Sequence, residues 1–391
     1  MKTKFLLTVF LVAALVSGLT LATGVVFADT PCDSAYVTQE GNVITVGPTG
    51  VDDTANIQCA FDAAVAASPG VDVRFTSGTF HTAQVVVNGF YGHFYGAGSK
   101  NTTVTNLPNL YVTPVDMYLN PPSADNPWPS LFAFIGGDFG ISDLAIHISG
   151  DDGTTGWSIF GIDPPIIELA HGIVILGNEA NSRFERVLVE GEPADNSLAG
   201  YNLINGIFFE GFIGAPSPPI TGTFQVYNST FRRVVSGTPV VNLSHAQVVV
   251  KNNNFDDVIL GMDGGDLVNS SLEFSHNVVN AIFGLDLYNL DLVEDVGSTI
   301  LIKNNGFQGV VGPILEQTFG DGNECLLQGN NVQNVNDIGI LLDEGIHGCT
   351  VVGGSNKTNV LDLGTDNVLV GVNNMGTGVG PDVQTLFKMM K

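Results

Sequence analysis

A seven-residue pattern recurs eight times between residues 181 and 360, and it limits the possible folds more than any other feature. Each copy begins with a polar residue, usually Asn, and most carry a bulky apolar residue three positions later. The copies begin 23 to 28 residues apart, at Asn181, Asn205, Asn228, Asn252, His276, Asn304, Gly329 and Gly354. That period is too short for repeats of paired helices, and the Leu pattern of leucine-rich repeats is absent. The chain must therefore bury its apolar residues by stacking one short unit on the next.

One turn of a parallel β-helix, with three short strands separated by turns, matches a period of this length. Strand-like runs precede the pattern at matching offsets, namely Phe224-Gln225-Val226, Val248-Val249-Val250, Leu272-Glu273-Phe274 and Ile300-Leu301-Ile302. Neighbouring coils would lie about 4.8 Å apart, so equal positions would form columns. We predict an all-β fold, a single-stranded right-handed parallel β-helix with coils of about 24 residues.

The columns assign a structural role to most of the conspicuous Asn, Phe and Arg residues. The first position should form a polar ladder at a turn, because Asn tolerates the left-handed conformation and stacked amides bond one another. The fourth position should form a core stack. Its members are Phe184, Phe208, Phe231, Phe255, Val279, Phe307 and Val332. The sixth position alternates in charge, which cross-strand pairing explains, and its members are Arg186, Glu210, Arg233 and Asp257.

Residues 1–28 have the features of a secretory signal peptide. Lys2 and Lys4 precede a long apolar run, and Val26-Phe27-Ala28 places small residues at a cleavage site. The run is also long enough for an uncleaved membrane anchor, an alternative that the abrupt polar switch at Asp29 disfavours. We expect a secreted protein without a transmembrane segment after cleavage.

The chain is strongly acidic, with a formal charge of −26. This balance argues against nucleic acid or anionic lipid as partners, because neutralising phosphates requires clustered Lys and Arg. It is compatible with divalent cations, although an acidic surface is also explained by solubility alone.

Four cysteines in an exported chain predict two disulfides. Cys32 and Cys59 flank the N-terminal segment, and Cys325 and Cys349 occupy nearly equal offsets in adjacent coils. We expect the pairs Cys32–Cys59 and Cys325–Cys349, the second joining neighbouring coils.

The N-terminal region resembles the entry region of pectate-lyase-like right-handed β-helix proteins. Residues 50–64 contain Gly-Val-Asp-Asp-Thr followed by Ile57-Gln58 in an amphipathic, helix-like segment, and Gly-Thr-Phe and Gly-Ala-Gly turns follow at 78–80 and 96–98. Thr76 stands where that family usually has Pro. The resemblance implies a short N-terminal capping helix and a protein that handles polysaccharides. The family also contains surface proteins with no known activity, so the fold alone does not fix the function.

We divide the chain into the signal peptide 1–28, a cap with the first coils at 29–100, the β-helix at 101–380 and a C-terminal tail at 381–391. Irregular insertions interrupt the coils at 112–131, 150–171, 191–203, 212–222 and 284–298. Function is expected in such loops, which would wall a groove along the fold. Their aromatic residues would stack on sugar rings, and the candidates are Trp128, Trp157, Tyr201 and Tyr288.

One insertion carries a catalytic-looking set of residues, Asp151, Asp152 and His171. Gly-Asp-Asp followed by Gly-His-Gly-like elements resembles polygalacturonase-type hydrolases, although this chain lacks their Asn-Thr-Asp and Arg-x-Lys elements. Hydrolysis with inversion needs one carboxylic acid to protonate the leaving oxygen and one carboxylate to activate water. The two Asp residues would supply that pair, and His171 would orient one of them.

A lyase is the other enzymatic interpretation, and it would need Ca²⁺ together with a cationic base. The acidic loop offers Asp291, Glu294 and Asp295 as ligands, with calcium as the candidate cofactor. Lys251 and Lys303 are the available bases. We therefore expect a secreted polysaccharide hydrolase or lyase whose partner is a glycan. The alternative is a non-catalytic glycan-binding or structural protein of the cell surface.

Overall fold

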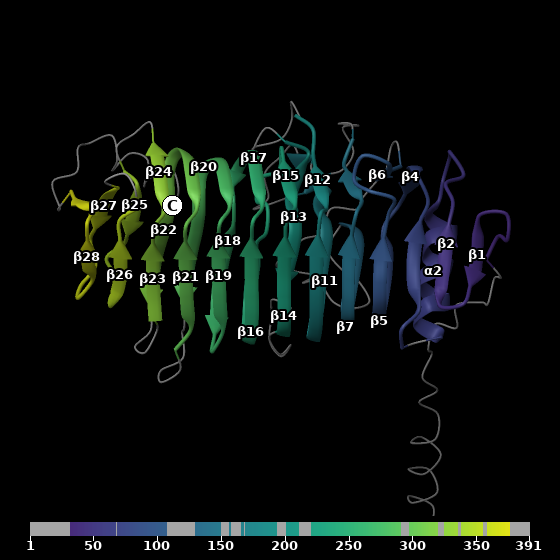
Figure 1. Cartoon of the computed structure of the whole chain (residues 1–391), viewed down its shortest axis with the longest axis horizontal. Coiled ribbons are helices and arrows are strands. Elements are labelled where there is room, and N and C mark those ends of the chain that lie inside the picture. Colours follow the sequence, from purple (N-terminus) through teal and green to yellow (C-terminus); the bar gives the residue numbers. More distant parts are fainter. Residues whose placement is uncertain are drawn as a thin grey trace, which may run out of the picture. The chain divides into compact units, whose positions relative to one another are not determined.

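The computed structural model describes residues 32–67, 69–107, 130–149, 156–157, 166–167, 169–193, 201–210, 220–290, 297–319, 324–334, 338–354 and 358–375. The expected signal peptide 1–28 and tail 381–391 lie outside these residues. In the part of the chain that is described from Asp33 onward, parallel strands follow one another in chain order (Figure 1). The predicted parallel β-helix is confirmed, with one helix in an otherwise β structure.

The strands form three parallel ladders, which are the faces of the β-helix. The first ladder contains β2 (Val43–Val46), β3 (Asp72–Phe75), β5 (Val85–Tyr95), β7 (Ser130–Ser142), β11 (Leu169–Glu185), β14 (Ile220–Tyr227), β16 (Val240–Lys251), β19 (Ser271–Ser275), β21 (Thr299–Lys303), β23 (Glu324–Gln328), β26 (Cys349–Val352) and β28 (Val368–Val370). The second contains β4 (Gly78–Thr82), β6 (Thr102–Asn106), β8 (Ala145–His147), β12 (Leu188–Glu190), β15 (Thr230–Arg232), β17 (Asn254–Leu260), β20 (Val278–Leu290), β22 (Gly306–Phe319) and β24 (Asn331–Asn334).

The third ladder uses the long strands a second time. This ladder contains the N-terminal parts of β5, β7, β11 and β16 and the C-terminal parts of β20 and β22. It also contains β13 (Leu203–Glu210), β18 (Asp263–Val268), β25 (Ile340–Leu342), β27 (Asn359–Asp362) and β29 (Asn373–Asn374). Two antiparallel pairs complete the strands, β1 (Val37–Glu40) with β2 and β9 (Gly156–Trp157) with β10 (Ile166–Ile167).

Helix α2 (Thr54–Ala66) brings its apolar side against the first coils. Phe61 is fully buried, and its ring meets those of Phe90 and Phe94 edge to face at 5.4 and 5.2 Å between centroids. The preceding Asp53 is also buried, and its carboxylate accepts hydrogen bonds from the backbone N–H groups of Thr49 and His81 at 2.6 and 2.8 Å. The Gly-Val-Asp-Asp-Thr motif therefore has a structural role, because the Asp53 carboxylate connects the start of the helix to strand β4.

A short turn joins the first ladder to the second in each coil. Its first two residues form two columns that are rich in asparagine. The first turn residue has positive φ, between 49° and 58°, in Asp143, Arg186, Asn228, Asn252, His276 and Asn304. The second turn residue is buried in Asn253, Asn277, Asn305 and Asn330. Each of these four amides donates to a backbone carbonyl of an earlier coil at 2.8 to 3.0 Å. The internal ladder is thus one residue later than the expected polar column.

The predicted columns are correct from Asn228 onward and wrong before it. Phe231, Phe255, Val279, Phe307 and Val332 are successive register partners, as predicted. Phe184 instead pairs with Ile141 and Val226, and Phe208 pairs with Val174. The reason is that residues 181 and 205 lie inside strands β11 and β13 and not at turns, so the first two copies of the pattern are coincidental matches.

The predicted charge column is also wrong as a single column. Arg186 and Glu210 lie at the ends of strands in different ladders, and Arg186 pairs with Asp143. A column of alternating basic and acidic side chains does exist in the second ladder, where His147, Glu190, Arg232 and Asp256 are successive register partners.

The cysteines are all disulfide-bonded in the described residues. Cys325 and Cys349 are register partners on β23 and β26, with Cα atoms 4.6 Å apart, and the predicted bond between neighbouring coils is confirmed. Cys32 and Cys59 are each disulfide-bonded as well. In the described part of the chain, no helix has the length and apolar character needed to cross a membrane.

Candidate functional site

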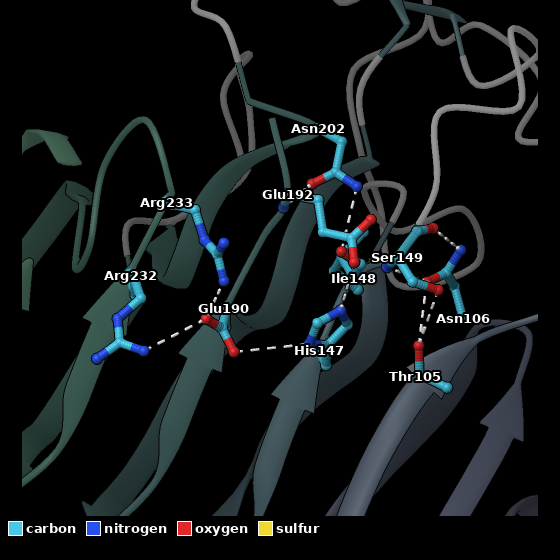
Figure 2. A network of polar contacts seen from close by, with 10 residues as sticks. All are labelled: Thr105, Asn106, His147, Ile148, Ser149, Glu190, Glu192, Asn202, Arg232 and Arg233. Atoms are coloured by element: carbon cyan, nitrogen blue, oxygen red, sulfur yellow. Dashed lines mark hydrogen bonds and ion pairs between the residues drawn. The ribbon is translucent and has the colours of Figure 1, made fainter. Parts of the chain in front are cut away.

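A network of charged side chains lies on the second ladder, and we call it the polar platform (Figure 2). It consists of His147, Glu190, Glu192, Arg232 and Arg233, at the C-terminal ends of strands β8, β12 and β15. The ring nitrogens of His147 lie 3.0 Å from Glu192 Oε1 and 3.6 Å from Glu190 Oε2. Both arginines also contact Glu190, so this carboxylate, 14% exposed, lies among three basic side chains.

The platform continues onto the next strand. Arg232 Nε lies 3.3 Å from Asp256 Oδ2 on β17. Tyr201 donates a hydrogen bond of 2.8 Å from its hydroxyl to Asp257 Oδ1. Burial and the neighbouring Asp257 carboxylate raise the pKa of Tyr201 to about 12. This tyrosine, predicted to stack on sugars, is therefore held by its hydroxyl as part of the platform.

Beside the platform, side-chain amides fix the points where three insertions leave the coils. Asn106 accepts a hydrogen bond of 2.8 Å from the backbone N–H of Ser149 and donates one of 3.0 Å to its carbonyl. Asn202, which is buried, accepts from the N–H of Glu192 at 2.7 Å and donates to the carbonyl of Ile148 at 3.1 Å. Figure 2 shows these residues side by side above strands β6, β8 and β12. These bonds connect the described ends of neighbouring coils to one another beside the platform.

A second cluster on the third ladder has a different character, and we call it the acidic face. It consists of Glu210, Asp263, Asp266, Asp286 and Tyr288. Asp263 on β18 is the register partner of Asp286 on β20, and Gly265 is the partner of Tyr288. A Cβ atom on Gly265 would overlap the Tyr288 ring, so glycine leaves the space in which that ring lies. Leu285 and Leu287 are fully buried in the core, and the alternation of a strand therefore points Asp286 and Tyr288 to the outer side.

Apolar residues border the acidic face along the same ladder. On one side, Leu176 is the partner of Glu210, and it packs with Val174 and Phe208. On the other side, Ile314 is the partner of Asp286, and it packs with Leu341. The carboxylates thus stand between two apolar clusters, a setting in which the charged form of an acid is disfavoured.

The ionisation of the acidic face reflects this setting. Burial, and then the nearby carboxylates of Asp263, Asp266, Asp286 and Glu210, raise the pKa of Tyr288 well above its ordinary value, so its hydroxyl stays protonated. Burial also raises the pKa of Asp266. General acid–base chemistry uses carboxyl groups whose surroundings move their pKa values apart, and the burial of Asp266 acts in that direction.

A shallow pocket of about 440 Å³ lies on the first ladder, apart from both clusters in the register. Its lining includes His245, Gln247, Asn269, Ser271 and Thr299, and no carboxylate. It offers hydrogen-bonding groups but no acid–base pair.

The residues that the sequence predicts for catalysis and metal binding lie mostly outside the described structure. Asp151, Asp152, Trp128, Asp291, Glu294 and Asp295 are all in segments that are not described. His171 lies in β11 and Trp157 in β9, where only the backbone is described. Tyr201 and Tyr288 are described, and they belong to different clusters, the platform and the acidic face.

Sequence reasoning missed Asp263, Asp266 and the platform. The signal for the acidic face is the recurrence of Asp263 as Asp286 after one coil, with Gly265 at the position opposite Tyr288. Among the described residues, no group of three or more His, Cys, Asp or Glu side chains is arranged to hold a metal ion.

No family model matches the chain, and no curated protein matches its sequence. Solved structures do align with it. The mannuronan C-5 epimerase AlgE6 A-module of Azotobacter vinelandii is 14% identical with a TM-score of 0.40, over 85% of this chain and 97% of that one. An exopolygalacturonase from Thermotoga maritima is 10% identical with a TM-score of 0.38, over 87% and 94%. The surface adhesin PfbA of Streptococcus pneumoniae is 15% identical with a TM-score of 0.36, over 85% and 90%.

These values are too low to carry an activity or a residue from any of those proteins to this chain. The fold is established by the strand pairing itself, in which successive coils join in parallel along three ladders. The architecture expected from the resemblance to pectate-lyase-like proteins is therefore confirmed: this chain is a parallel β-helix protein.

Proposed function

We propose that this protein is secreted and hydrolyses a polysaccharide at the acidic face. The observation that carries the proposal is the pairing of Asp263 with Asp286 on adjacent strands, next to Asp266 and Tyr288. Glycoside hydrolysis needs a carboxylic acid and a carboxylate on opposite sides of one glycosidic bond. The acidic face supplies Asp263 and Asp266 from one coil and Asp286 from the next.

Each residue of the face has a role in this proposal. Asp266, whose pKa is raised by burial, donates a proton to the leaving glycosidic oxygen. Asp263 and Asp286 supply the carboxylate that activates water or attacks the anomeric carbon. Tyr288 presents its ring to a sugar and donates a hydrogen bond from its protonated hydroxyl.

The insertions complete the proposed site. Asp151, Asp152 and His171 remain proposed catalytic residues, and Trp128 and Trp157 remain proposed sugar contacts, in segments that would flank the groove. Calcium bound by Asp291, Glu294 and Asp295 would act on the same side, since this loop follows β20 directly. We further propose that residues 1–28 direct export, in accord with the disulfides, and that α2 closes the N-terminal end of the core.

The test is the release of reducing ends from a panel of polysaccharides by the purified protein. Asp286→Asn and Asp266→Asn are expected to lower the rate about 10²- to 10⁴-fold, the range for loss of a general acid or base. Asp366→Asn is the matched control, because Asp366 is exposed and distant in the register, and its positive φ suits Asn equally well. The control should keep the full rate, and thermal unfolding should show that all variants are folded.

The same assay separates the alternatives. Full activity in Asp286→Asn together with inactivity of Asp152→Asn would move catalysis from the acidic face to the insertion at 150–171. An unsaturated product detected by its ultraviolet absorbance would indicate elimination by a lyase. Tight binding of a glycan without any cleavage would favour the non-catalytic alternative.

A further inference from the structure

We infer that the shallow pocket on the first ladder is a second binding site, which holds an uncharged oligosaccharide through its hydroxyl groups. The pocket is separate from the acidic face, so this inference does not depend on the proposed hydrolysis. Its volume of about 440 Å³ is within the range of about 300–1,000 Å³ that is usual for small-molecule sites. Residues on or just before strands β14, β16, β19 and β21 line it, and these strands are consecutive in the ladder (Figure 1).

The floor of the pocket is made of small residues whose hydrogen bonds run along the coils. Ala246 and Ser270 are buried there, and Gly222 and Gly297 complete the lining at either end. The N–H of Ala246 donates to Ser270 Oγ at 3.1 Å, and the N–H of Ser270 donates to Ser298 Oγ at 3.1 Å. The surface is hollowed here because no long side chain stands at these positions, whereas polar side chains stand on both sides of them.

On one side of the floor, four uncharged polar side chains form a column that we call the polar row. Its members are successive register partners, namely Thr223, Gln247, Ser271 and Thr299. Three steps between coils give the row a length of about 14 Å. Within the described part of the chain, these four side chains form no hydrogen bond with another protein group. Their hydroxyl and amide groups are therefore available to a ligand.

On the other side of the floor, His245 and Asn269 hold each other in place. Both have positive φ, 55° and 50°. Asn269 Nδ2 lies 3.3 Å from His245 Nε2, and His245 Nδ1 lies 2.8 Å from Ser244 Oγ. An amide nitrogen only donates, so Nε2 accepts and the proton of the neutral imidazole is on Nδ1. This arrangement leaves the amide oxygen of Asn269 as an acceptor at the pocket.

The chemistry of the lining selects the class of ligand. The described residues that line the pocket carry hydroxyl, amide and imidazole groups, but no carboxylate and no Lys or Arg. A uronate or a phosphate would lack the cation that its recognition requires. A peptide would require an open strand edge or an apolar pocket, and the four strands are paired on both sides. An uncharged ligand with many hydroxyls, each a donor and an acceptor, matches these groups.

The experiment measures binding of neutral trisaccharides of β-1,4-linked glucose, mannose or xylose by ligand-detected NMR titration. We expect at least one of them to bind, and to bind at least tenfold more tightly than its monosaccharide, because the polar row extends over four coils. The trimer of galacturonic acid is the charged comparison, and we expect it to bind more weakly.

The variant Gln247→Leu/Thr299→Val removes hydrogen-bonding groups from the polar row at nearly constant side-chain size. Both residues are exposed, so the variant should fold, and it should bind the trisaccharide about tenfold more weakly, as expected for two lost hydrogen bonds. Thr350→Val is the matched control, because Thr350 lies on first-ladder strand β26 between two buried residues and outside the pocket. The control should bind as the wild type does.

Three results would overturn the inference: unchanged binding in Gln247→Leu/Thr299→Val, no binding of any neutral trisaccharide, and tighter binding of the charged trimer. Cleavage, followed in the same samples, separates this inference from the proposed function. Binding that is lost in Asp286→Asn but not in Gln247→Leu/Thr299→Val would place the glycan at the acidic face alone, which overturns the second site and leaves hydrolysis standing. Binding that depends on Gln247 and Thr299, without cleavage of any polysaccharide, would support the second site and refute hydrolysis.

Discussion

At the scale of single residues, Asp266 is the most informative side chain of the acidic face. It has a positive φ of 53°, lies half-buried in β18 three residues after Asp263, and its pKa is raised by burial alone. A group whose charged form is disfavoured in the fold makes the protein less stable wherever that group is ionised. Such a residue has a cost in stability, and function is the usual reason for keeping it.

Replacing Asp266 by Asn should therefore stabilise the protein at neutral pH. The folded pKa of Asp266 is above its unfolded value, so the wild type loses stability as pH rises through the folded pKa, whereas the Asn variant does not. The gain should disappear below about pH 4, where Asp is protonated in both states. Urea unfolding across pH measures this difference, with Asp366→Asn as the control. A variant that is less stable than the wild type at pH 7 would contradict the assigned environment.

The sequence identified Tyr288 but not its carboxylate partners, and the reason is physical. An aromatic residue in an insertion can be identified from the sequence. Asp263 acquires its role only from the register, which makes it the partner of Asp286 on the next strand. Tyr201 is also a predicted sugar contact, yet its hydroxyl donates a hydrogen bond to Asp257. Nothing in the sequence near residue 201 predicts that bond, because its partner is 56 residues away.

At the scale of elements, the internal asparagine ladder holds the turn between the first and second ladders. Asn277 is buried, its amide donates to the Val250 carbonyl at 2.9 Å, and its oxygen accepts from the N–H of Asn253 at 2.9 Å. In the coil before it, three consecutive Asn residues at 252, 253 and 254 are exposed, buried and exposed. The residue type therefore does not say which Asn faces inward, so the sequence indicates the left-handed column at 252 and not the buried ladder at 253.

Asn277→Ala should lower the free energy of unfolding by about 2–4 kcal/mol, because it leaves a buried N–H and a buried C=O without partners. Asn252→Gly is the matched control, since Asn252 is exposed with a φ of 58° and glycine adopts that conformation without strain. The control should stay within about 0.5 kcal/mol of the wild type. Urea unfolding of both variants measures the difference, and equal losses would show that burial of the ladder contributes little.

At the scale of the whole molecule, the sequence predicted the architecture better than the site. Three features of the sequence predict stacked β coils: the period, the apolar column from Phe231 to Val332, and the spacing of Cys325 and Cys349. Each can be found by comparing positions one period apart. The site depends on which ladder each polar residue joins. The long strands β7, β11 and β16 take part in two ladders, so the pattern in the chain does not reveal the face to which a residue belongs.

The charges divide between the ladders in a way that the net charge conceals. Arg232 and Arg233 lie on the platform, and Arg186 and Lys303 lie at the ends of first-ladder strands, each close to a carboxylate. The third ladder carries Asp263, Asp266 and Asp286. This separation connects the fold to the function that we propose. It makes one face suitable for acid–base chemistry and leaves the ion pairs of the other ladders to stabilise the coils.

The most direct test of this account is a crystal structure of the Asp286→Asn variant with the oligosaccharide that the wild type cleaves fastest. We expect a sugar ring over Tyr288 and a glycosidic oxygen within about 3.2 Å of the Asp266 carboxyl group, the reach of a general acid. A sugar bound only on the polar platform or the first ladder would contradict the account, as would one on the acidic face with no carboxyl group in reach of a glycosidic oxygen.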